Sequence, residues 1–243
     1  MDPEILFEDP YLVAAYKPGG WLVHRSSIDH HETRFLLQHL RDLVGCHLYP
    51  IHRLDKPTSG VILFAKSSQV AARAQAELAS ESSVKAYVAV CRGWCPEEGV
   101  IDYPLPPVSD FKHQRKRPKA DQPRQPALTR FRRLDTTELP YAVDRYPSSR
   151  YSLVEIELET GRRHQIRRHF KHIHHPLIGC PKYGKSVHNR FFAEQFGCAR
   201  LLLHAHRLEL NHPATGERLC IYAPPRGCFA SMLETLGWVL PAR

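Results

Sequence analysis

A single carboxylate in the first quarter of the chain has the surroundings of a reactive group. Asp55 ends the tetrapeptide His-Arg-Leu-Asp, and the polar residues 57–60, Pro-Thr-Ser-Gly, separate it from an apolar run over 61–64. An acid held on a tight turn beside an arginine is how an enzyme keeps a nucleophilic carboxylate ionised and directed at its substrate. Taken alone, however, an aspartate near an arginine is more often a structural ion pair than a catalyst.

Two later motifs carry groups that could act with this acid. The first is Lys85-Ala86-Tyr87, where the aromatic ring is either a core residue of a strand or a ring that stacks on a nucleobase and moves a proton. The second is the segment 160–169, Thr-Gly-Arg-Arg-His-Gln-Ile-Arg-Arg-His. It is either a basic helix washed by solvent or an anion-binding helix start, because cations at a helix N-terminus oppose the dipole and favour a negative partner.

These three motifs, in this order and at this separation, resemble those of the RluA family of RNA pseudouridine synthases, and the resemblance covers nearly the whole chain. It implies that Asp55 is the nucleophile, that Tyr87 is the active-site tyrosine and that Arg167 pairs with the aspartate. One departure is Cys180, which stands where the family commonly has an aspartate after Ile-Gly. We assign contacts with the substrate or RNA to His52, Arg53, Arg162, Arg163, His164, Gln165, Arg168, Lys116 and Arg117.

The activity that the resemblance implies is the isomerisation of a uridine to pseudouridine. The N1–C1′ bond breaks, the uracil turns and C5 joins C1′, without redox change, ATP or metal, so no cofactor is expected. The Asp55 carboxylate would attack C1′ or act as a base at C2′ to give a glycal, and Arg167 would hold it charged and in place. The sequence is most similar to members that modify uridine 65 in the T stem of tRNA, which makes tRNA the favoured partner. A synthase acting on rRNA and a non-catalytic RNA-binding protein are the alternatives.

The bulk composition fits an RNA partner. The 243 residues are 42% hydrophobic and hold 34 Lys and Arg against 25 Asp and Glu, a formal charge of +9. Such a basic balance favours a polyanionic partner, although a solvated basic surface would have the same charge. The acidic N-terminus is unlike a signal peptide and no apolar run approaches the roughly 18 residues of a membrane helix, so we expect a cytoplasmic protein without membrane contact. Without heptads or an apolar surface stripe, we expect a monomer.

A metal enzyme is the main rival that the side chains suggest. Histidines gather at 172, 174 and 175 and again at 204 and 206, and the chain has seven cysteines. Zinc sites prefer close cysteine pairs such as C-x2-C, which the sequence does not contain, and Cys91 and Cys95 have a looser spacing. We therefore expect no metal site, and we expect the cysteines to be reduced thiols.

Hydrophobic periodicity predicts strands and helices in irregular alternation. A turn is expected over 17–20, and apolar residues that alternate with glutamates over 154–158 predict a half-buried strand. Helical spacing marks 35–43, and Ser67 or Ser68 offers a cap for a helix over 69–80. The other strand candidates are 5–7, 12–16, 61–65, 84–90 and 201–210. This alternation predicts an α/β (α+β) fold around one sheet, and the resemblance implies a mixed, mostly antiparallel sheet flanked by helices and loops.

Two further segments bear on the predicted site. A helix is expected to open at Gly161 and to end at His175-Pro176, with Ile166 and Phe170 on an apolar stripe and Arg163 and Arg167 on a separate basic face. Residues 104–126 hold six prolines and six lysines or arginines, which predicts a basic loop that is either a plain linker or an RNA-gripping segment. Since no second domain is evident, we expect residues 1–243 to form one catalytic domain without a separate RNA-binding domain.

Overall fold

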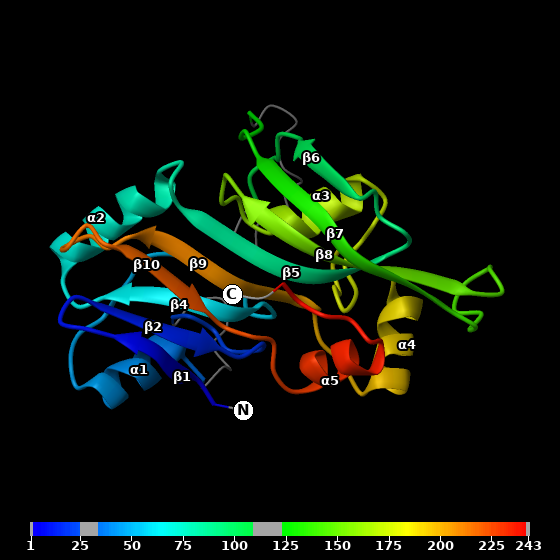
Figure 1. Ribbon diagram of the computed structural model, residues 1–243, viewed down its shortest axis with the longest axis horizontal. Helices are drawn as coiled ribbons and strands as arrows, with labels where there is room; N and C mark the ends of the chain where they lie inside the picture. Colours follow the sequence, from blue (N-terminus) through cyan, green and yellow to red (C-terminus); the bar gives the residue numbers. More distant parts are fainter. Residues whose placement is uncertain (1, 25–33, 109–122, 242–243) are drawn as a thin grey trace.

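The computed structural model describes residues 2–24, 34–108 and 123–241, and one ten-stranded sheet runs through it (Figure 1). The strands lie in the order β1-β2-β4-β9-β5-β8-β7-β6, with β3 paired to β4 and β10 paired to β9. Among these described strands only β4 and β9 run parallel. Their bounds are β1 (Glu4–Glu8), β2 (Leu12–Lys17), β3 (Tyr49–Pro50), β4 (Ser59–Ala65), β5 (Val84–Arg92), β6 (Glu98–Asp102), β7 (Leu128–Leu139), β8 (Ser149–Leu158), β9 (Leu203–Asn211) and β10 (Arg218–Tyr222).

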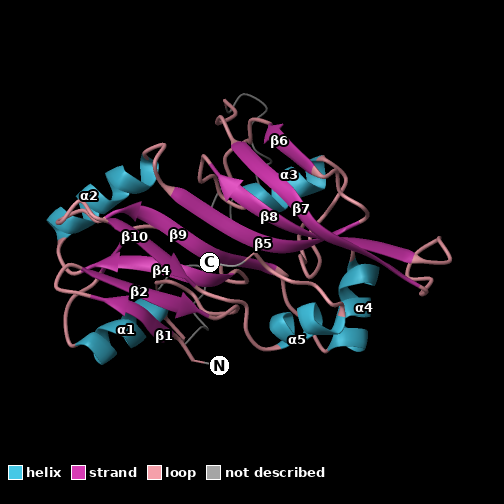
Figure 2. Cartoon of the chain, in the orientation of Figure 1, coloured by secondary structure: helices cyan, strands magenta, loops and turns pink. Residues whose placement is uncertain are grey.

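Helices cover the sheet in separate places (Figure 2). Within the described residues they are α1 (Leu36–Val44), α2 (Ser68–Ala79), α3 (Gln165–His172), α4 (Ser186–Phe196) and α5 (Cys228–Thr235). In this view α1 and α2 lie toward one end of the molecule, and α4 and α5 lie toward the other. The third helix packs on the β7–β8 part of the sheet, where the rings of Phe170 and Phe131 meet edge to face with centroids 5.5 Å apart.

Strand β5 lies where the apolar clusters of the core meet. Val88 and Val90 belong to the cluster beneath α4 and α5, whereas Ala89 and Cys91 belong to the cluster beneath α3. Because successive side chains of a strand point to opposite faces, both faces of this strand are buried. The residue just before these, Tyr87, packs against the cluster formed by β2, β4, α1 and α2. The strand therefore holds Tyr87 in a rigid frame.

The mixed, mostly antiparallel sheet confirms the predicted fold class, and several elements lie where the periodicity indicated. These are β1, β2, β4, β5, β8 and β9 among the strands and α1 and α2 among the helices. The predicted cap is also present, since the Ser67 side chain accepts a hydrogen bond from the Val70 N–H at 3.2 Å. None of the described helices has the length and apolar character needed to cross a membrane.

A turn is present at residues 19–20, within the predicted range 17–20, but it does not join β1 to β2. The hairpin between β1 and β2 closes earlier, where the Asp9 carboxylate accepts hydrogen bonds from the N–H groups of Tyr11 (2.7 Å) and Leu12 (2.6 Å). An aspartate that binds the backbone ahead of it favours a turn without glycine. Residues 17–20 instead leave the end of β2 and contact the loop that carries Asp55, where the Gly20 N–H donates to the Lys56 carbonyl at 2.8 Å.

The strand predicted over 154–158 is present as part of β8, but the prediction that it is half-buried was wrong at Glu155. The side chain of Glu155 is only 10% exposed. Its carboxylate lies 3.0 Å from Arg132 Nη2 and 3.3 Å from His206 Nε2. The hydrogen bond with His206, followed by that with Arg132, outweighs burial and lowers the pKa of Glu155 to about 2. The alternation of apolar and acidic residues could not reveal this, since the neutralising groups come from β7 and β9.

This buried carboxylate predicts a specific acid sensitivity. Because the folded pKa of about 2 lies below the ordinary value of 4.5, the ionised group stabilises the fold above that ordinary value, and the contribution is lost as the pH falls toward 2. A shift of this size corresponds to about 3 kcal/mol. Glu155→Gln should therefore lower the free energy of unfolding, measured by urea denaturation, by a margin that shrinks as the pH falls through this window. A margin independent of pH would contradict the assignment.

Candidate active site at the Asp55–Arg167 ion pair

Asp55 lies on the loop between β3 and β4, and the side chain of Lys17, whose pKa is lowered to about 7 by burial, holds that loop. Lys17, which is 0% exposed, donates from Nζ to the carbonyl oxygens of Thr58 (2.7 Å), Lys56 (3.0 Å) and Pro18 (3.2 Å). The Thr58 N–H also donates to the Asp55 carbonyl at 3.0 Å, which closes a turn. The end of β2 is thereby tied to the loop, and the Asp55 side chain is left 25% exposed.

Removal of this amino group should loosen the loop. Lys17→Met keeps the length of the side chain but leaves three carbonyl oxygens without their donor, so we expect a loss of stability on the order of 3 kcal/mol. Urea denaturation measures the loss. The matched control is Lys66→Met, which removes the surface pair with Glu8 and should cost about 1 kcal/mol or less. Equal losses for the two variants would show that the Lys17 contacts do not hold the loop.

Arg167 comes from the first turn of α3, 112 residues after Asp55, and meets it directly. Its Nη1 donates to Asp55 Oδ2 at 2.9 Å, and its Nε donates to Cys180 Sγ at 3.3 Å. The guanidinium carbon also lies 5.3 Å from the ring centroid of Tyr183, within the range of a cation–π contact. Burial opposes the charge, but Cys180 and Asp55 together raise the pKa of Arg167 above its ordinary value. The predicted pair is therefore present, with the cation fixed from three sides.

The start of α3 differs from the prediction, and the difference shapes the site. The helix begins at Gln165, because the Gln165 side-chain oxygen accepts hydrogen bonds from Thr160 Oγ1 (2.8 Å) and the Arg162 N–H (2.9 Å) and closes residues 160–164 into a loop. The predicted basic face was wrong as well. Arg163 precedes the helix, and the side chain of Arg167 is only 5% exposed.

His164 occupies the N-cap of α3 with a φ of 55°, a left-handed conformation that is uncommon for a residue other than glycine. This backbone turns its ring toward the ion pair, with Nε2 at 3.8 Å from Asp55 Oδ2 and Nδ1 at 3.1 Å from the Tyr183 hydroxyl. Burial lowers the pKa of His164 to about 4, and Arg167 adds to the effect while Asp55 opposes it. At neutral pH the imidazole is uncharged, so Arg167 is the cation that balances Asp55.

Tyr87 and Asp55 line the same pocket, which is open to solvent. Burial, with a further contribution from the Asp55 charge, raises the pKa of Tyr87 well above its ordinary value. The phenol therefore stays protonated at neutral pH. Of the two roles that the sequence left open for this ring, stacking and hydrogen bonding suit a protonated phenol better than proton abstraction.

Two of the arginines predicted to contact RNA, Arg53 and Arg162, line this pocket together with Arg167, whereas Arg163 and Arg168 do not. The other side-chain contacts are with backbone carbonyls: Arg162 with Pro126 (3.0 Å), Arg168 with Pro106 (2.9 Å) and Arg163 with Val108 (3.5 Å). Lys116 and Arg117 lie outside the described residues. Contacts between these arginines and RNA stay a prediction.

Two other predicted contacts have structural partners. The Gln165 amide also donates to the Leu128 carbonyl (2.9 Å) and to Thr129 Oγ1 (2.9 Å), so all four of its hydrogen-bonding positions are occupied. His52 Nε2 accepts from the Leu63 N–H at 3.1 Å, and burial lowers the pKa of His52 to about 4. An RNA contact through either side chain stays a prediction, and for Gln165 it would require the loss of an existing bond.

Sequence reasoning missed two side chains that position the pair. Lys17 was predicted as part of a turn, and two of its three carbonyl contacts are with a loop 39 to 41 residues away. Tyr183 lies in a segment without periodicity, so nothing in the sequence indicates that its ring contacts Arg167 and His164. Cys180 departs from the family pattern, and in the structure its Sγ accepts a hydrogen bond from Arg167 Nε.

Comparison with known proteins assigns this fold and site to a class. The family model for RNA pseudouridylate synthase matches residues 11–172, which include Asp55, Tyr87 and Arg167, and the chain belongs to that family. The tRNA pseudouridine synthase C of Vibrio cholerae serotype O1 is 46% identical over 235 residues, 97% of this chain and 96% of the relative. The protein of the same name from Pasteurella multocida is 46% identical over 240 residues, 99% and 98% of the two chains. The solved structure of human RNA Pseudouridylate Synthase Domain Containing 4 superposes with a TM-score of 0.71 at 27% identity, over 98% of this chain and 94% of that one.

Proposed function

We propose that this pseudouridine synthase acts on tRNA, at uridine 65 of the T stem, with Asp55 as its nucleophile. The observation that carries the assignment of Asp55 is the 2.9 Å contact between Arg167 Nη1 and Asp55 Oδ2 beside an open pocket that Tyr87 also lines. The relatives named tRNA pseudouridine synthase C, which match almost the full length of the chain, support the choice of tRNA.

The geometry suggests how the reaction proceeds. Arg167 and His164 both approach Oδ2 of Asp55, so we assign to Oδ1 either the attack on C1′ or the removal of the C2′ proton. Positive charge that develops on the sugar as the N1–C1′ bond breaks is stabilised by the nearby carboxylate, as in glycoside cleavage. The protonated Tyr87 stacks on the released uracil while it turns to present C5 to C1′.

Access to a uridine within a stem requires that the nucleotide flip out, which costs a few kcal/mol. The basic residues around the pocket oppose that cost through phosphate contacts. These phosphate contacts account for the arginines at the pocket other than Arg167, because the proposed chemistry needs only Arg167.

The proposal has a direct test in two parts. Purified protein is mixed with tRNA that carries tritium at C5 of uridine, and the released label is counted, because formation of the C5–C1′ bond expels that hydrogen. Release from wild-type tRNA and none from tRNA with cytidine at position 65 is the expected result. Pseudouridine mapping in total RNA, with and without the protein, is the second part. If the protein changes the pseudouridine content of an rRNA site and leaves tRNA unchanged, the choice of substrate is overturned. Binding of tRNA without release of tritium would overturn the catalytic role.

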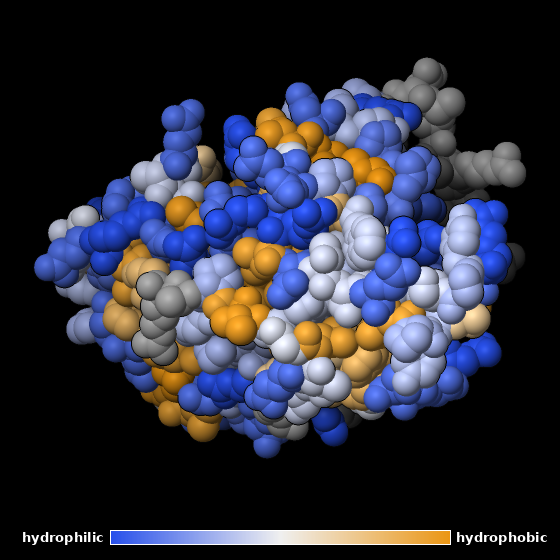
Figure 3. Space-filling view, turned by 45° about the vertical axis from the view of Figure 1, so that its right-hand side comes forward, coloured by the Kyte–Doolittle hydropathy of each residue, from blue (hydrophilic) through white to orange (hydrophobic). Residues whose placement is uncertain are grey.

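We further propose that residues 1–243 act as one catalytic domain and as a cytoplasmic monomer. A sheet that links the first strand, β1, with the late strands β9 and β10 supports a single domain. Apolar surface on the face in Figure 3 is broken into patches between hydrophilic side chains, which supports a monomer. Light scattering on the purified chain measures its mass, and a dimer mass at assay concentration would refute the monomer.

A further inference from the structure

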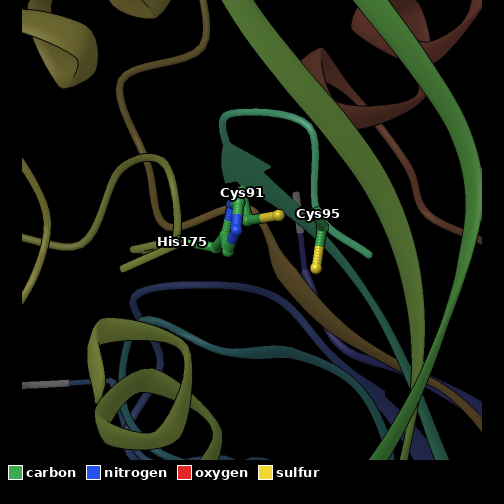
Figure 4. Close-up of side chains that lie close together, drawn as sticks. All are labelled: Cys91, Cys95 and His175. Carbon is green, nitrogen blue, oxygen red and sulfur yellow. The ribbon is translucent and has the colours of Figure 1, made fainter. Parts of the chain in front are cut away.

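Three metal-binding side chains meet at the far end of β5 from the active site (Figure 4). Cys91 lies near the end of the strand, Cys95 lies in the loop before β6, and His175 follows α3. Their donor atoms, two sulfurs and one ring nitrogen, all lie within 4.8 Å of one another. Cys91 is four residues beyond Tyr87, about 13 Å along an extended strand. The cluster is therefore separate from the reacting groups.

The backbone around the cluster is held firmly. Cys91 pairs with Ser152 of β8 and forms a bridge with Leu177. The Cys95 N–H donates to Ser152 Oγ at 2.9 Å, and that hydroxyl donates in turn to the Gly93 carbonyl at 2.8 Å. Since both cysteines are tied to one serine, their thiols stay together without a metal. A preformed arrangement lowers the entropy cost of binding a metal ion.

His175 is oriented as metal-binding histidines are. Its Nδ1 lies 2.9 Å from the Arg92 carbonyl oxygen, and donation to a carbonyl fixes the tautomer and leaves the lone pair of Nε2 for a metal. Gly93 permits the close approach of the ring. With a φ of 85°, it lies where an added Cβ would be 3.1 Å from Nδ1. Any larger residue would strain the loop and press on the imidazole.

We propose that Cys91, Cys95 and His175 bind one zinc-type divalent cation, with solvent as the fourth ligand. Two thiolates and an imidazole are typical zinc ligands. The three residues between Cys91 and Cys95 lie within the two to four that are usual for a cysteine pair in such sites, so this spacing is compatible with zinc although it is looser than C-x2-C. Two thiolates neutralise a divalent cation, so the occupied site carries no net charge into the core, where both cysteines are 0% exposed.

The cluster reaches an open cavity on its histidine side. His175 is half-buried and lines this cavity together with His174 and His188, whereas the two cysteines are buried behind it. Tetrahedral binding at about 2.3 Å for sulfur and about 2.0 Å for nitrogen requires the donors to close by roughly 1 Å from the widest separation observed. The metal would join the end of β5 to the C-terminal end of α3, the helix that carries Arg167, and stiffen both.

Metal binding to the full chain tests the proposal without any RNA. The protein is reduced, stripped with a chelator and dialysed against zinc, and the bound metal is measured by mass spectrometry of the elements. We expect one zinc per chain and a higher melting temperature. Cobalt in place of zinc should give the charge-transfer absorption of a thiolate ligand and the visible bands of a tetrahedral site.

Variants locate the bound metal. Cys91→Ser/Cys95→Ser should abolish stoichiometric binding, and His175→Asn should weaken zinc affinity by at least about tenfold. The matched control is Cys46→Ser/Cys220→Ser, which removes two thiols outside the cluster and should keep one zinc per chain. Circular dichroism checks that each variant folds.

Three outcomes would overturn the proposal. They are wild-type protein that binds no stoichiometric zinc, a cobalt spectrum without a thiolate band, and a cysteine variant that folds and binds as the wild type does. The cobalt spectrum of the wild type keeps the test decisive even where a variant fails to fold. A metal-free protein whose mass shows a Cys91–Cys95 disulfide would assign the pair to redox chemistry instead.

Discussion

Asp55→Asn should abolish tritium release from uridine-labelled tRNA while leaving the affinity for tRNA close to that of the wild type. Asparagine keeps the size of the side chain and removes its charge, so it cannot act as nucleophile or as base. Loss of a nucleophile in other enzymes costs several orders of magnitude, and we expect a fall of at least about ten-thousand-fold in the single-turnover rate. Binding persists because phosphate contacts supply most of the affinity for RNA.

The same substitution has a cost in stability that must be separated from the loss of chemistry. It leaves the guanidinium of Arg167, which is 5% exposed, without its carboxylate, and an uncompensated buried charge costs about 3–5 kcal/mol. Urea denaturation measures that loss, and rates are compared at a temperature where both proteins are folded. The control is Asp42→Asn on α1, where the carboxylate accepts from the exposed Gln38 amide. Tritium release by Asp55→Asn within tenfold of the wild-type rate would remove Asp55 from the mechanism.

The sequence located the residues that meet in the pocket more reliably than the contacts that hold them. Asp55, Tyr87 and Arg167 each lie in a short local motif, and the order of the motifs is visible without a structure. The predicted start of the helix at Gly161 was wrong, because hydrogen bonds to the Gln165 side chain hold residues 160–164 as a loop. Periodicity failed at Glu155 for a similar reason, since its partners Arg132 and His206 come from other strands.

Some elements left no clear pattern at all. The strand β7 carries Arg130, Arg132 and Arg133, so it lacks the apolar alternation that marks a strand. Arg132 and Arg133 form ion pairs with Glu155 and Glu97, and these contacts exist only after the chain has folded. Local motifs in the sequence therefore indicate which residues meet in the pocket, and tertiary contacts decide how they are held.

Arg167 offers the second large effect, because its role depends on geometry as well as charge. Arg167→Lys keeps the positive charge, but a single ammonium group cannot reproduce the planar fork that contacts both Asp55 Oδ2 and Cys180 Sγ. We expect the single-turnover rate to fall about a hundredfold, the cost of a reacting group displaced by about 1 Å. The affinity for tRNA should change little. The control on the same helix is Arg168→Lys, whose guanidinium contacts the Pro106 carbonyl. It should weaken tRNA binding and leave the rate of the bound complex unchanged.

A double-mutant cycle tests whether Arg167 acts through Asp55. Arg167→Met alone and Asp55→Asn alone each leave a polar or charged partner unsatisfied, whereas the double variant removes both charges. The double variant should therefore be more stable than the sum of the single losses predicts, with a coupling of about 1–3 kcal/mol measured by urea denaturation. The loss of activity should also be less than additive. Once Asp55 is absent, Arg167→Met should cause no further loss of rate, because a residue that only positions the nucleophile has nothing left to position. Additive losses in both measurements would mean that Arg167 contacts the substrate independently of Asp55.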